Sequence, residues 1–191
     1  MAEKKIDNQR CVTPVFRVAF AKVFKAEDFQ GDGKFKYSLA MLFPRNANLS
    51  ALMKCAEAAK VKLWGADKTK WPKNVYSPFL DGDDKSDLVG YADHTVVNVS
   101  NQNKPEIVDS QLCPITEESR EFYSGCYAIA SVRASAYGGP GTKFKPGVAF
   151  YLEAVQKKKD GDKFSGAKSA NEVFTASADG DDAGLDEASG W

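Results

Sequence analysis

Short stretches in which apolar and polar residues alternate recur along this chain, and that two-residue period constrains its fold more than any other feature. The predicted strands span residues 12–24, 34–43, 91–99, 106–108, 122–137 and 148–156. A glycine-containing turn at 29–33 separates the first two, which form a predicted hairpin with one apolar and one basic face. Helical spacing predicts one helix at 49–63, with Asn48 as its candidate N-cap. The pattern predicts a mainly β protein, an OB-fold-like antiparallel β-barrel with one helix after strand 2.

Charge is distributed unevenly, although the 191 residues include 26 basic and 26 acidic ones. Residues 175–191 contain five acids and no Lys or Arg, which leaves 26 bases against 21 acids in residues 1–174. The tail is otherwise mainly Ala, Gly and Ser, so we predict that it is disordered. We therefore expect an OB-fold domain at 1–174 and an acidic tail at 175–191. A basic body favours a polyanionic partner, most commonly nucleic acid.

Several function classes lack the residues that they require. No apolar run approaches the roughly 20 residues of a membrane-spanning helix, so no membrane partner is expected. No nucleophile, zinc-protease or phosphate-loop motif is present, so no enzyme is expected. The four cysteines are widely spaced and remote from His94, so we predict reduced thiols, no metal site and no cofactor. The acidic run at 81–84 is interpreted as a solvated turn, because it lacks the spacing of a calcium-binding loop.

Basic and aromatic residues are interleaved between positions 54 and 76, and this mixture favours single-stranded nucleic acid. Ammonium groups track phosphates and release counterions, while flat rings stack on unpaired bases. The candidate nucleic-acid-binding residues of this segment are Lys62, Trp64, Lys68, Lys70, Trp71, Lys73 and Tyr76. Trp71 stands in a predicted loop and is the better stacking candidate. For Trp64 the alternative is that it closes the end of the helix against the core.

A second group of candidates lies at the end of the predicted strand 122–137 and in the loop after it. Its members are Arg133, Tyr137, Lys143, Phe144 and Lys145, and the group extends to Lys34 and Lys36 on the polar face of the first hairpin. In a small barrel, strand faces and the loops between strands form the binding cleft. Residues 138–141, Gly-Gly-Pro-Gly, are interpreted as a hairpin tip. The aromatic residues predicted to lie in the core are Phe16, Phe20, Phe35 and Phe43.

The acidic tail ends in an aromatic residue. Its candidate partner-docking residues are Asp181, Asp182, Asp186, Glu187 and Trp191. Two roles are open: the acids compete with DNA for the basic cleft, or the tail docks a protein with the indole of Trp191 in an apolar pocket. The competing hypothesis for the whole chain is a non-enzymatic interaction or assembly module that docks through Trp191 and has no nucleic-acid role.

Two motifs give the chain a family resemblance. The F-Y-S-G-x-Y stretch at 122–127 and the G-V-x-F-x-L-x-x-V-Q stretch at 147–156 resemble bacteriophage single-stranded DNA-binding proteins of the OB-fold type, as does the acidic tail with its terminal aromatic. The resemblance implies a protein that coats single-stranded DNA during phage replication and recombination in the cytoplasm of the infected bacterial host. It also implies that the tail recruits phage or host replication proteins. Gly125 and Gly147 are expected to allow close backbone packing. The oligomeric state, monomer or dimer, and the choice between DNA and RNA stay open.

Overall fold

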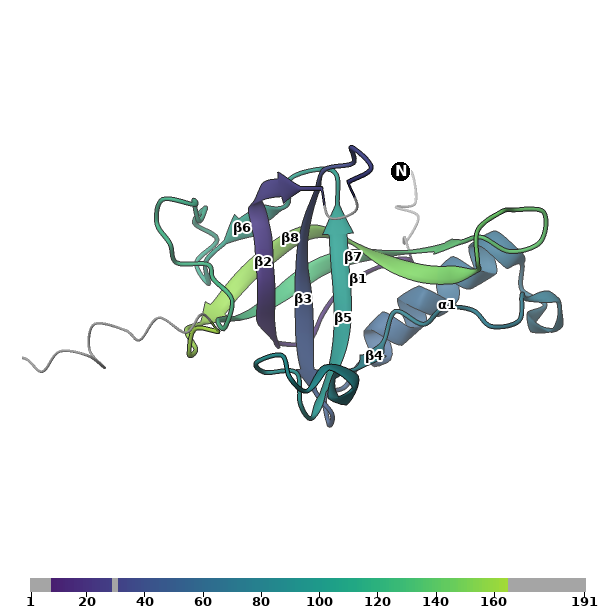
Figure 1. Ribbon diagram of the computed structural model, residues 1–191, viewed down its shortest axis with the longest axis horizontal. Coiled ribbons are helices and arrows are strands. Elements are labelled where there is room, and N and C mark those ends of the chain that lie inside the picture. The colour runs from purple at the N-terminus through teal and green to yellow at the C-terminus, as the bar shows by residue number, and fades with distance from the viewer. Residues whose placement is uncertain (1–7, 29–30, 165–191) are drawn as a thin grey trace, which may run out of the picture.

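The computed structural model describes residues 8–28 and 31–164, so the predicted boundary at residue 174 and the acidic tail lie outside the described residues. The strands are β1 (Arg10–Val12), β2 (Phe16–Glu27), β3 (Lys36–Pro44), β4 (Leu80–Asp81), β5 (His94–Asn101), β6 (Glu106–Val108), β7 (Tyr127–Tyr137) and β8 (Gly147–Lys159). An α-helix, α1 (Ser50–Trp64), follows β3 as predicted, and the connection from it to β5 contains two 3-10 helices, η1 (Lys68–Lys70) and η2 (Gly82–Lys85). Figure 1 shows α1 beside the loop that joins β7 to β8, at one end of the molecule.

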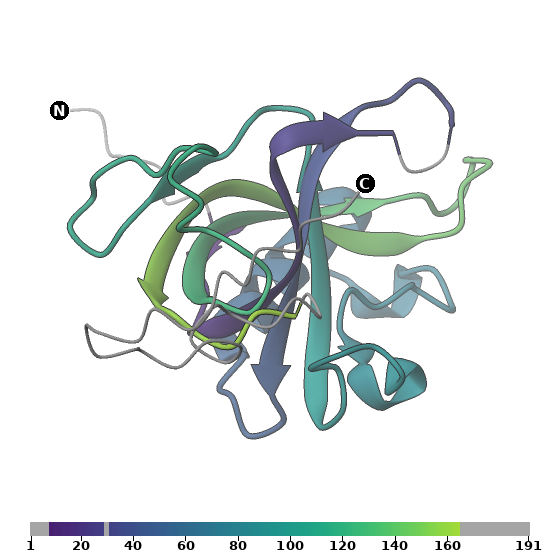
Figure 2. The same ribbon diagram turned by 60° about the vertical axis from the view of Figure 1, so that its left-hand side comes forward.

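Five strands pair into a closed ring. Antiparallel pairings join β2 to β3, β3 to β5, β7 to β8, and β7 to the start of β2. The ring closes through a short parallel pairing of β5 with β8, in which Val99 is opposite Phe150 and Ser100 is opposite Tyr151. Figure 2 shows the strong curvature of β7 and β8 that this closure requires. The ring matches the predicted OB-fold barrel, except that β5 and β6 pair with β8 in parallel where an antiparallel sheet was predicted.

The interior of the ring holds the apolar side chains that alternate along the strands. The largest fully buried side chains of this core are Phe16, Phe43, Phe150, Met41, Leu52, Leu152, Val18, Val23, Val97 and Val99. The rings of Phe16 and Phe43 meet edge to face, with centroids 5.6 Å apart. Helix α1 packs against β7 and buries Leu52, whose removal from water contributes about 1.5–3 kcal/mol. The prediction that Phe16 and Phe43 lie in the core is therefore confirmed.

The core prediction is wrong for the other two aromatic residues. Phe20 is 52% exposed and Phe35 is 60% exposed. The pairing of β2 with β3 shifts register between Ala19 and Lys22, and Phe20 adopts a φ of 49° within that irregularity. A bulge changes which face the next side chain occupies, so the ring of Phe20 points outward. Phe35 precedes the first residue of β3 and has no position in the sheet.

The strand predicted at 122–137 begins only at Tyr127, because residues 122–126 form a turn. Gly125 in this turn has a φ of 117°, and a Cβ at this position would lie 2.0 Å from the carbonyl oxygen of Asp162. A Cβ on Gly147 would lie 2.4 Å from the hydroxyl of Tyr137. The close packing predicted at both motif glycines is confirmed.

The predicted N-cap needs correction, and one strand was missed. Leu49 rather than Asn48 occupies the N-cap of α1, although the Asn48 side chain accepts a hydrogen bond from the amide of Ser50 (3.0 Å). Strand β1 was not predicted. Of the four free cysteines, Cys55 and Cys126 are buried, Cys11 is partly buried and Cys113 is exposed. Burial, together with the neighbouring thiol of Cys55, raises the pKa of Cys11 to about 12.

The connection between α1 and β5 is a long, largely irregular excursion that covers part of the outer face of β3 and β5. A second small core forms there from Ala19, Ala40, Leu42, Tyr91 and Val96. Arg45 donates a hydrogen bond to Asp81 (2.7 Å) and also binds the carboxylate of Asp83. The side chain of Asp81 accepts from the amide of Asp83 (3.0 Å), so the acidic run forms a capped turn tied to Arg45. Across the described residues, no helix combines the length and apolar character that crossing a membrane requires.

Candidate nucleic-acid interface

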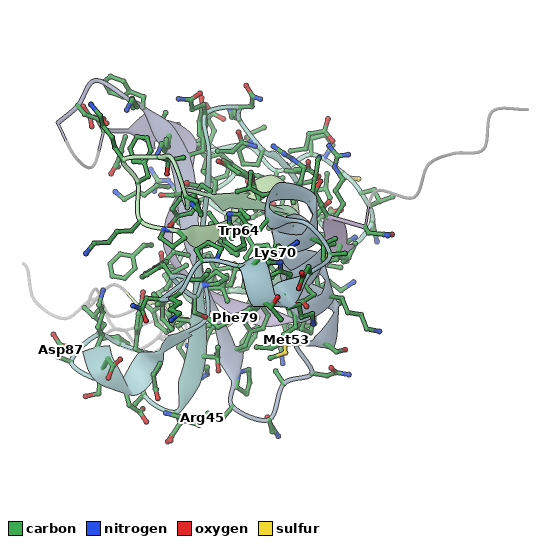
Figure 3. All side chains as sticks on the ribbon, turned by 90° about the vertical axis from the view of Figure 1, so that its right-hand side faces the viewer. Arg45, Met53, Trp64, Lys70, Phe79 and Asp87 are labelled. Carbon is green, nitrogen blue, oxygen red and sulfur yellow. The ribbon has the colours of Figure 1, made fainter. Side chains whose placement is uncertain are left out.

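The end of α1 meets the loop between β7 and β8, and this contact brings the two predicted groups together. Trp64, the last residue of α1, donates a hydrogen bond from Nε1 to the carbonyl oxygen of Gly138 (3.1 Å). A Cβ on Gly139 would lie 3.0 Å from the same nitrogen. Both glycines have positive φ, which glycine adopts at little steric cost. Trp64 is half-buried between the helix and the hairpin tip, and Figure 3, viewed from this end, shows it beside Lys70.

Trp71 lies next to Trp64 and is flanked by lysines. The two indole centroids are 6.2 Å apart, and Nε1 of Trp71 donates to the carbonyl oxygen of Gly65 (2.8 Å). The ammonium groups of Lys60 and Lys68 lie 5.7 Å and 5.6 Å from the centroid of the Trp71 ring, within cation–π range. The fold therefore fixes the indole and places positive charge beside it, as base stacking with phosphate contact requires.

The predicted lysines at this end differ in their ion pairing. Lys68 pairs with Glu57, and Lys70 lies 3.4 Å from the carboxylate of Asp67. Lys62 is exposed and donates to the neutral side chain of Gln9, and three other predicted lysines, Lys73, Lys143 and Lys145, are exposed and make no ion pair within the described residues. These three carry charge that is not compensated locally.

Three exposed tyrosines, Tyr76, Tyr137 and Tyr151, continue the surface from the hairpin tip onto the barrel. The amide of Tyr76 donates to the carbonyl oxygen of Pro146 (2.8 Å), which attaches the excursion to the start of β8. Tyr137 covers Gly147 at the end of β7. Burial, with a smaller contribution from the nearby Tyr76 and Tyr151, raises the pKa of Tyr137. The three phenol rings therefore lie near one another.

Tyr151 and Arg133 occupy the middle of this surface. The guanidinium carbon of Arg133 lies 5.1 Å from the centroid of the Tyr151 ring, and its Nε is 3.6 Å from the carboxylate of Glu153. Through the strand pairings Tyr151 is opposite Ser100, which is opposite Ser38. Two short polar side chains therefore follow the exposed ring across the sheet.

A polar cavity of about 500 Å³ opens beside Arg133. Its lining residues are Gln9, Arg10, Lys62, Asn101, Asn103, Lys104, Arg133, Leu152 and Glu153. Nε of Arg10 binds the carboxylate of Glu153 (2.9 Å), and Lys62 donates to the side chain of Gln9 (2.7 Å). Four bases face one acid, and such an excess of positive charge attracts phosphate.

The groups just described form one surface, which we call the aromatic–basic strip. It comprises Arg10, Lys60, Lys62, Trp64, Lys68, Lys70, Trp71, Lys73, Tyr76, Lys104, Arg133, Tyr137, Lys143, Lys145 and Tyr151. Two predicted residues, Lys34 and Lys36, lie at the β2–β3 hairpin, where Tyr37 is opposite Asn101 of the polar cavity. Lys34 pairs with Asp32 (3.1 Å), and Lys36 is opposite Glu27 in the sheet.

Four members of the strip were not among the predicted site residues. Tyr151 had a usable signal, because it occupies a polar-face position in the strand 148–156. Lys60 lies within the basic and aromatic segment but was left out of the predicted site. Arg10 and Lys104 had no local signal, because the fold alone carries residues so distant in sequence to the same cavity as Arg133.

Residues suited to metal chemistry do not gather at the strip. The described part of the chain contains no group of three His, Cys, Asp or Glu side chains placed to hold a metal ion. At the start of β5, Nδ1 of His94 lies 2.7 Å from the carbonyl oxygen of Ala92, so a backbone contact occupies this nitrogen.

Comparison with known proteins identifies the family. The family model described as "Enterobacter phage Enc34, ssDNA-binding protein" matches residues 9–184. The chain belongs to this family. The phage single-stranded DNA-binding family that the two motifs indicated is thereby confirmed, and the match extends into the acidic tail. The tail residues Asp181, Asp182, Asp186, Glu187 and Trp191 lie outside the described residues, and their roles stay predictions.

Relatives of the Enc34-type family agree with the fold. The chain is 29% identical over 163 residues to "Putative protein p50" of Acyrthosiphon pisum secondary endosymbiont phage 1, covering 78% of this chain and 83% of that protein. The single-stranded DNA-binding protein of bacteriophage Enc34, solved in complex with ssDNA, superposes with a TM-score of 0.69 at 20% identity, covering 85% of this chain and 97% of that one. Bacteriophage T7 gp2.5, a single-stranded DNA-binding protein, gives 0.57 at 16% identity, covering 88% and 99%. These similarities confirm the mainly β fold.

Proposed function

We propose that this member of the Enc34-type family binds single-stranded DNA along the aromatic–basic strip with little sequence preference. Its cellular role is then to coat DNA strands exposed during phage replication and recombination, in the cytoplasm of the infected bacterium. One observation carries the proposal: rings and cations from β1, α1, η1, β7, β8 and three connecting loops converge on one surface. The ssDNA complex of the Enc34 protein supports the choice of ligand.

The geometry of the strip accounts for sequence tolerance. Every base has a π-face, so the indole of Trp71 and the phenols of Tyr76, Tyr137 and Tyr151 stack on any base, with about 1–3 kcal/mol from each stack. The lysines around Trp71 and the bases of the polar cavity attract the phosphates, which carry no sequence information. No catalytic group is needed for this activity, so we propose that the protein is not an enzyme.

The acidic tail has a regulatory role in this proposal. Its acids oppose the sign of the strip, so the tail competes with DNA for the basic residues or recruits phage or host replication proteins. Both roles fit a chain whose charge is divided between a basic body and an acidic end. The alternative, an assembly module without a nucleic-acid role, loses support from the family assignment.

Fluorescence anisotropy with labelled oligo-dT tests the proposal. Trp71→Ala and Tyr151→Ala each remove one stacking surface and should weaken binding by about 5- to 150-fold, the equivalent of 1–3 kcal/mol. Leu112→Ala, which truncates an exposed apolar side chain in the connection between β6 and β7, is the matched control and should bind normally. Equal affinity for all three variants would refute binding at the strip. Parallel titrations with oligo-U and duplex DNA separate DNA, RNA and duplex preference.

A further inference from the structure

An apolar cavity of about 380 Å³ on the outer face of β2 has no part in the aromatic–basic strip. It is lined by Ala19, Phe20, Asp87, Leu88, Val89, Ser124 and Phe164. Val89 is 64% exposed, and Phe20 is similarly open to solvent. Neighbouring apolar side chains that a fold leaves exposed mark a site of interaction rather than a part of the core.

One wall of this cavity is formed by Phe20, whose backbone conformation is strained. Phe20 has a φ of 49°, which costs a bulky residue about 1–3 kcal/mol, and its ring stands edge-on to Tyr91 with centroids 6.1 Å apart. The bulge turns the ring out of the barrel interior and toward the cavity. An aromatic ring kept outward at such a cost suggests that it packs against a further group.

The segment after β8 is fastened beside the cavity. The hydroxyl of Tyr123 donates to Asp160 (2.9 Å), and Arg17 donates from Nη2 to the carbonyl oxygen of Asp162 (2.9 Å). The amide of Phe164 donates to the carbonyl oxygen of Ser124 (3.0 Å). The F-Y-S-G turn therefore holds the base of the tail, and Phe164, the last described residue, lines the cavity.

We propose that this cavity receives the indole of Trp191 from the same chain. The 27 residues from 165 to 191 begin at the rim of the cavity and span up to roughly 90 Å when extended, so they return to it easily. Tethering makes the contact intramolecular, with an effective concentration in the millimolar range. Trp191 is the one aromatic residue in the acidic tail, and the cavity offers it an apolar lining.

Charges around the cavity agree with this occupant. The guanidinium of Arg17 lies 4.4 Å from the centroid of the Phe164 ring, and Lys159 and Lys163 lie over the neighbouring rings of Tyr127 and Tyr123. These cations complement the acids that precede Trp191. The carboxylate of Asp87, which also lines the cavity, is an acceptor for the indole N–H, a group that needs a partner when buried. The inference does not depend on DNA binding.

The test is ¹⁹F NMR on the full-length protein labelled with 5-fluorotryptophan, with the Trp191 signal assigned by its loss in Trp191→Phe. A soluble nitroxide should broaden this signal less than half as much as it broadens free 5-fluorotryptophan. Phe20→Gly removes the ring and also relieves the backbone strain, so the fold is retained, and Val89→Asp repels the acidic segment. Both variants should raise the broadening to the value of the free amino acid. Leu112→Asp is the control and should leave it unchanged.

Three results overturn the proposal. They are full broadening of Trp191 in the parent protein, protection that survives both cavity variants, and protection that is lost on tenfold dilution. The last result assigns the cavity to the tail of a second copy. Titration of the parent with oligo-dT, followed through the signals of Trp64 and Trp71, reports separately on the proposed DNA-binding function.

Discussion

Replacing Lys73, Lys143 and Lys145 together with Gln should reduce the salt dependence of DNA binding. These side chains are exposed at the hairpin-tip end of the strip and make no ion pair within the described residues. Phosphate contacts through such lysines release bound counterions, and this release makes affinity fall as salt rises. Gln keeps much of the side-chain length and removes only the charge.

The magnitude follows from counting one phosphate for each lysine. For single strands the slope of log K against log salt changes by about 0.7 for each phosphate contact, so three contacts change it by about 2. Between 50 mM and 200 mM salt, this change makes the loss of affinity of the triple variant about 20-fold smaller than that of the parent. Anisotropy titrations with oligo-dT at four salt concentrations measure both slopes.

The control removes the same charge from other faces. Lys25, Lys54 and Lys85 are exposed lysines outside the strip, and their replacement by Gln should change the slope by less than about 0.5. Equal slopes for the two triple variants would show that net charge alone governs binding, and the reasoning from the strip would then be refuted.

Three further results are expected. Gly125→Ala should lower the free energy of unfolding in urea by more than about 2 kcal/mol, because the new Cβ overlaps a backbone oxygen at a position of positive φ. Gly141→Ala is the control: it also has positive φ but open space around it, and should cost only about 1–2 kcal/mol. Equal losses for the two variants contradict the overlap. Deletion of residues 175–191 should raise affinity for oligo-dT at low salt and have little effect at high salt; unchanged or weaker binding contradicts competition by the tail. A hydrogen bond from Lys157 lowers the pKa of Asp160, so this carboxylate contributes stability that is fully present above the unfolded pKa of about 3.9. The contribution is lost as the pH falls below that value and through the lower pKa of the folded state. The difference in unfolding free energy between the parent and Asp160→Asn, below about 1 kcal/mol for so exposed a group, should therefore shrink between pH 5 and pH 2; a constant difference contradicts the assignment.

Local patterns were sufficient to predict most of the barrel. Alternation located β6 and β8 closely, because the buried and exposed positions of these strands alternate. It also located β3, although residues 39–43 of that strand are buried on both faces. It failed at Phe20, where a bulge reverses the face, and at the turn 122–126, where contact with the segment after β8 overrides strand propensity. A backbone irregularity of this kind depends on the partner strand and has no signature in composition.

Residues of the strip could be predicted where they are close together in the sequence, and not where only the fold brings them together. Trp71 and its lysines belong to one segment, so their proximity could be read directly from the sequence. The contact of Trp64 with Gly138 supports the expected convergence of the two candidate groups. Arg10 and Lys104 join Arg133 only through strand pairing, and such long-range assembly cannot be inferred from spacing.

The parallel seam between β5 and β8 has a consequence for biosynthesis. It joins Val99 to Phe150 and Ser100 to Tyr151, about fifty positions apart, and β8 also supplies most of the partners of β7. A nascent chain that has not yet exposed its last strand therefore carries two open sheet edges with apolar faces, a state prone to aggregation. The ring closes only after β8 has been translated, and chains that stop before β8 should accumulate as insoluble material.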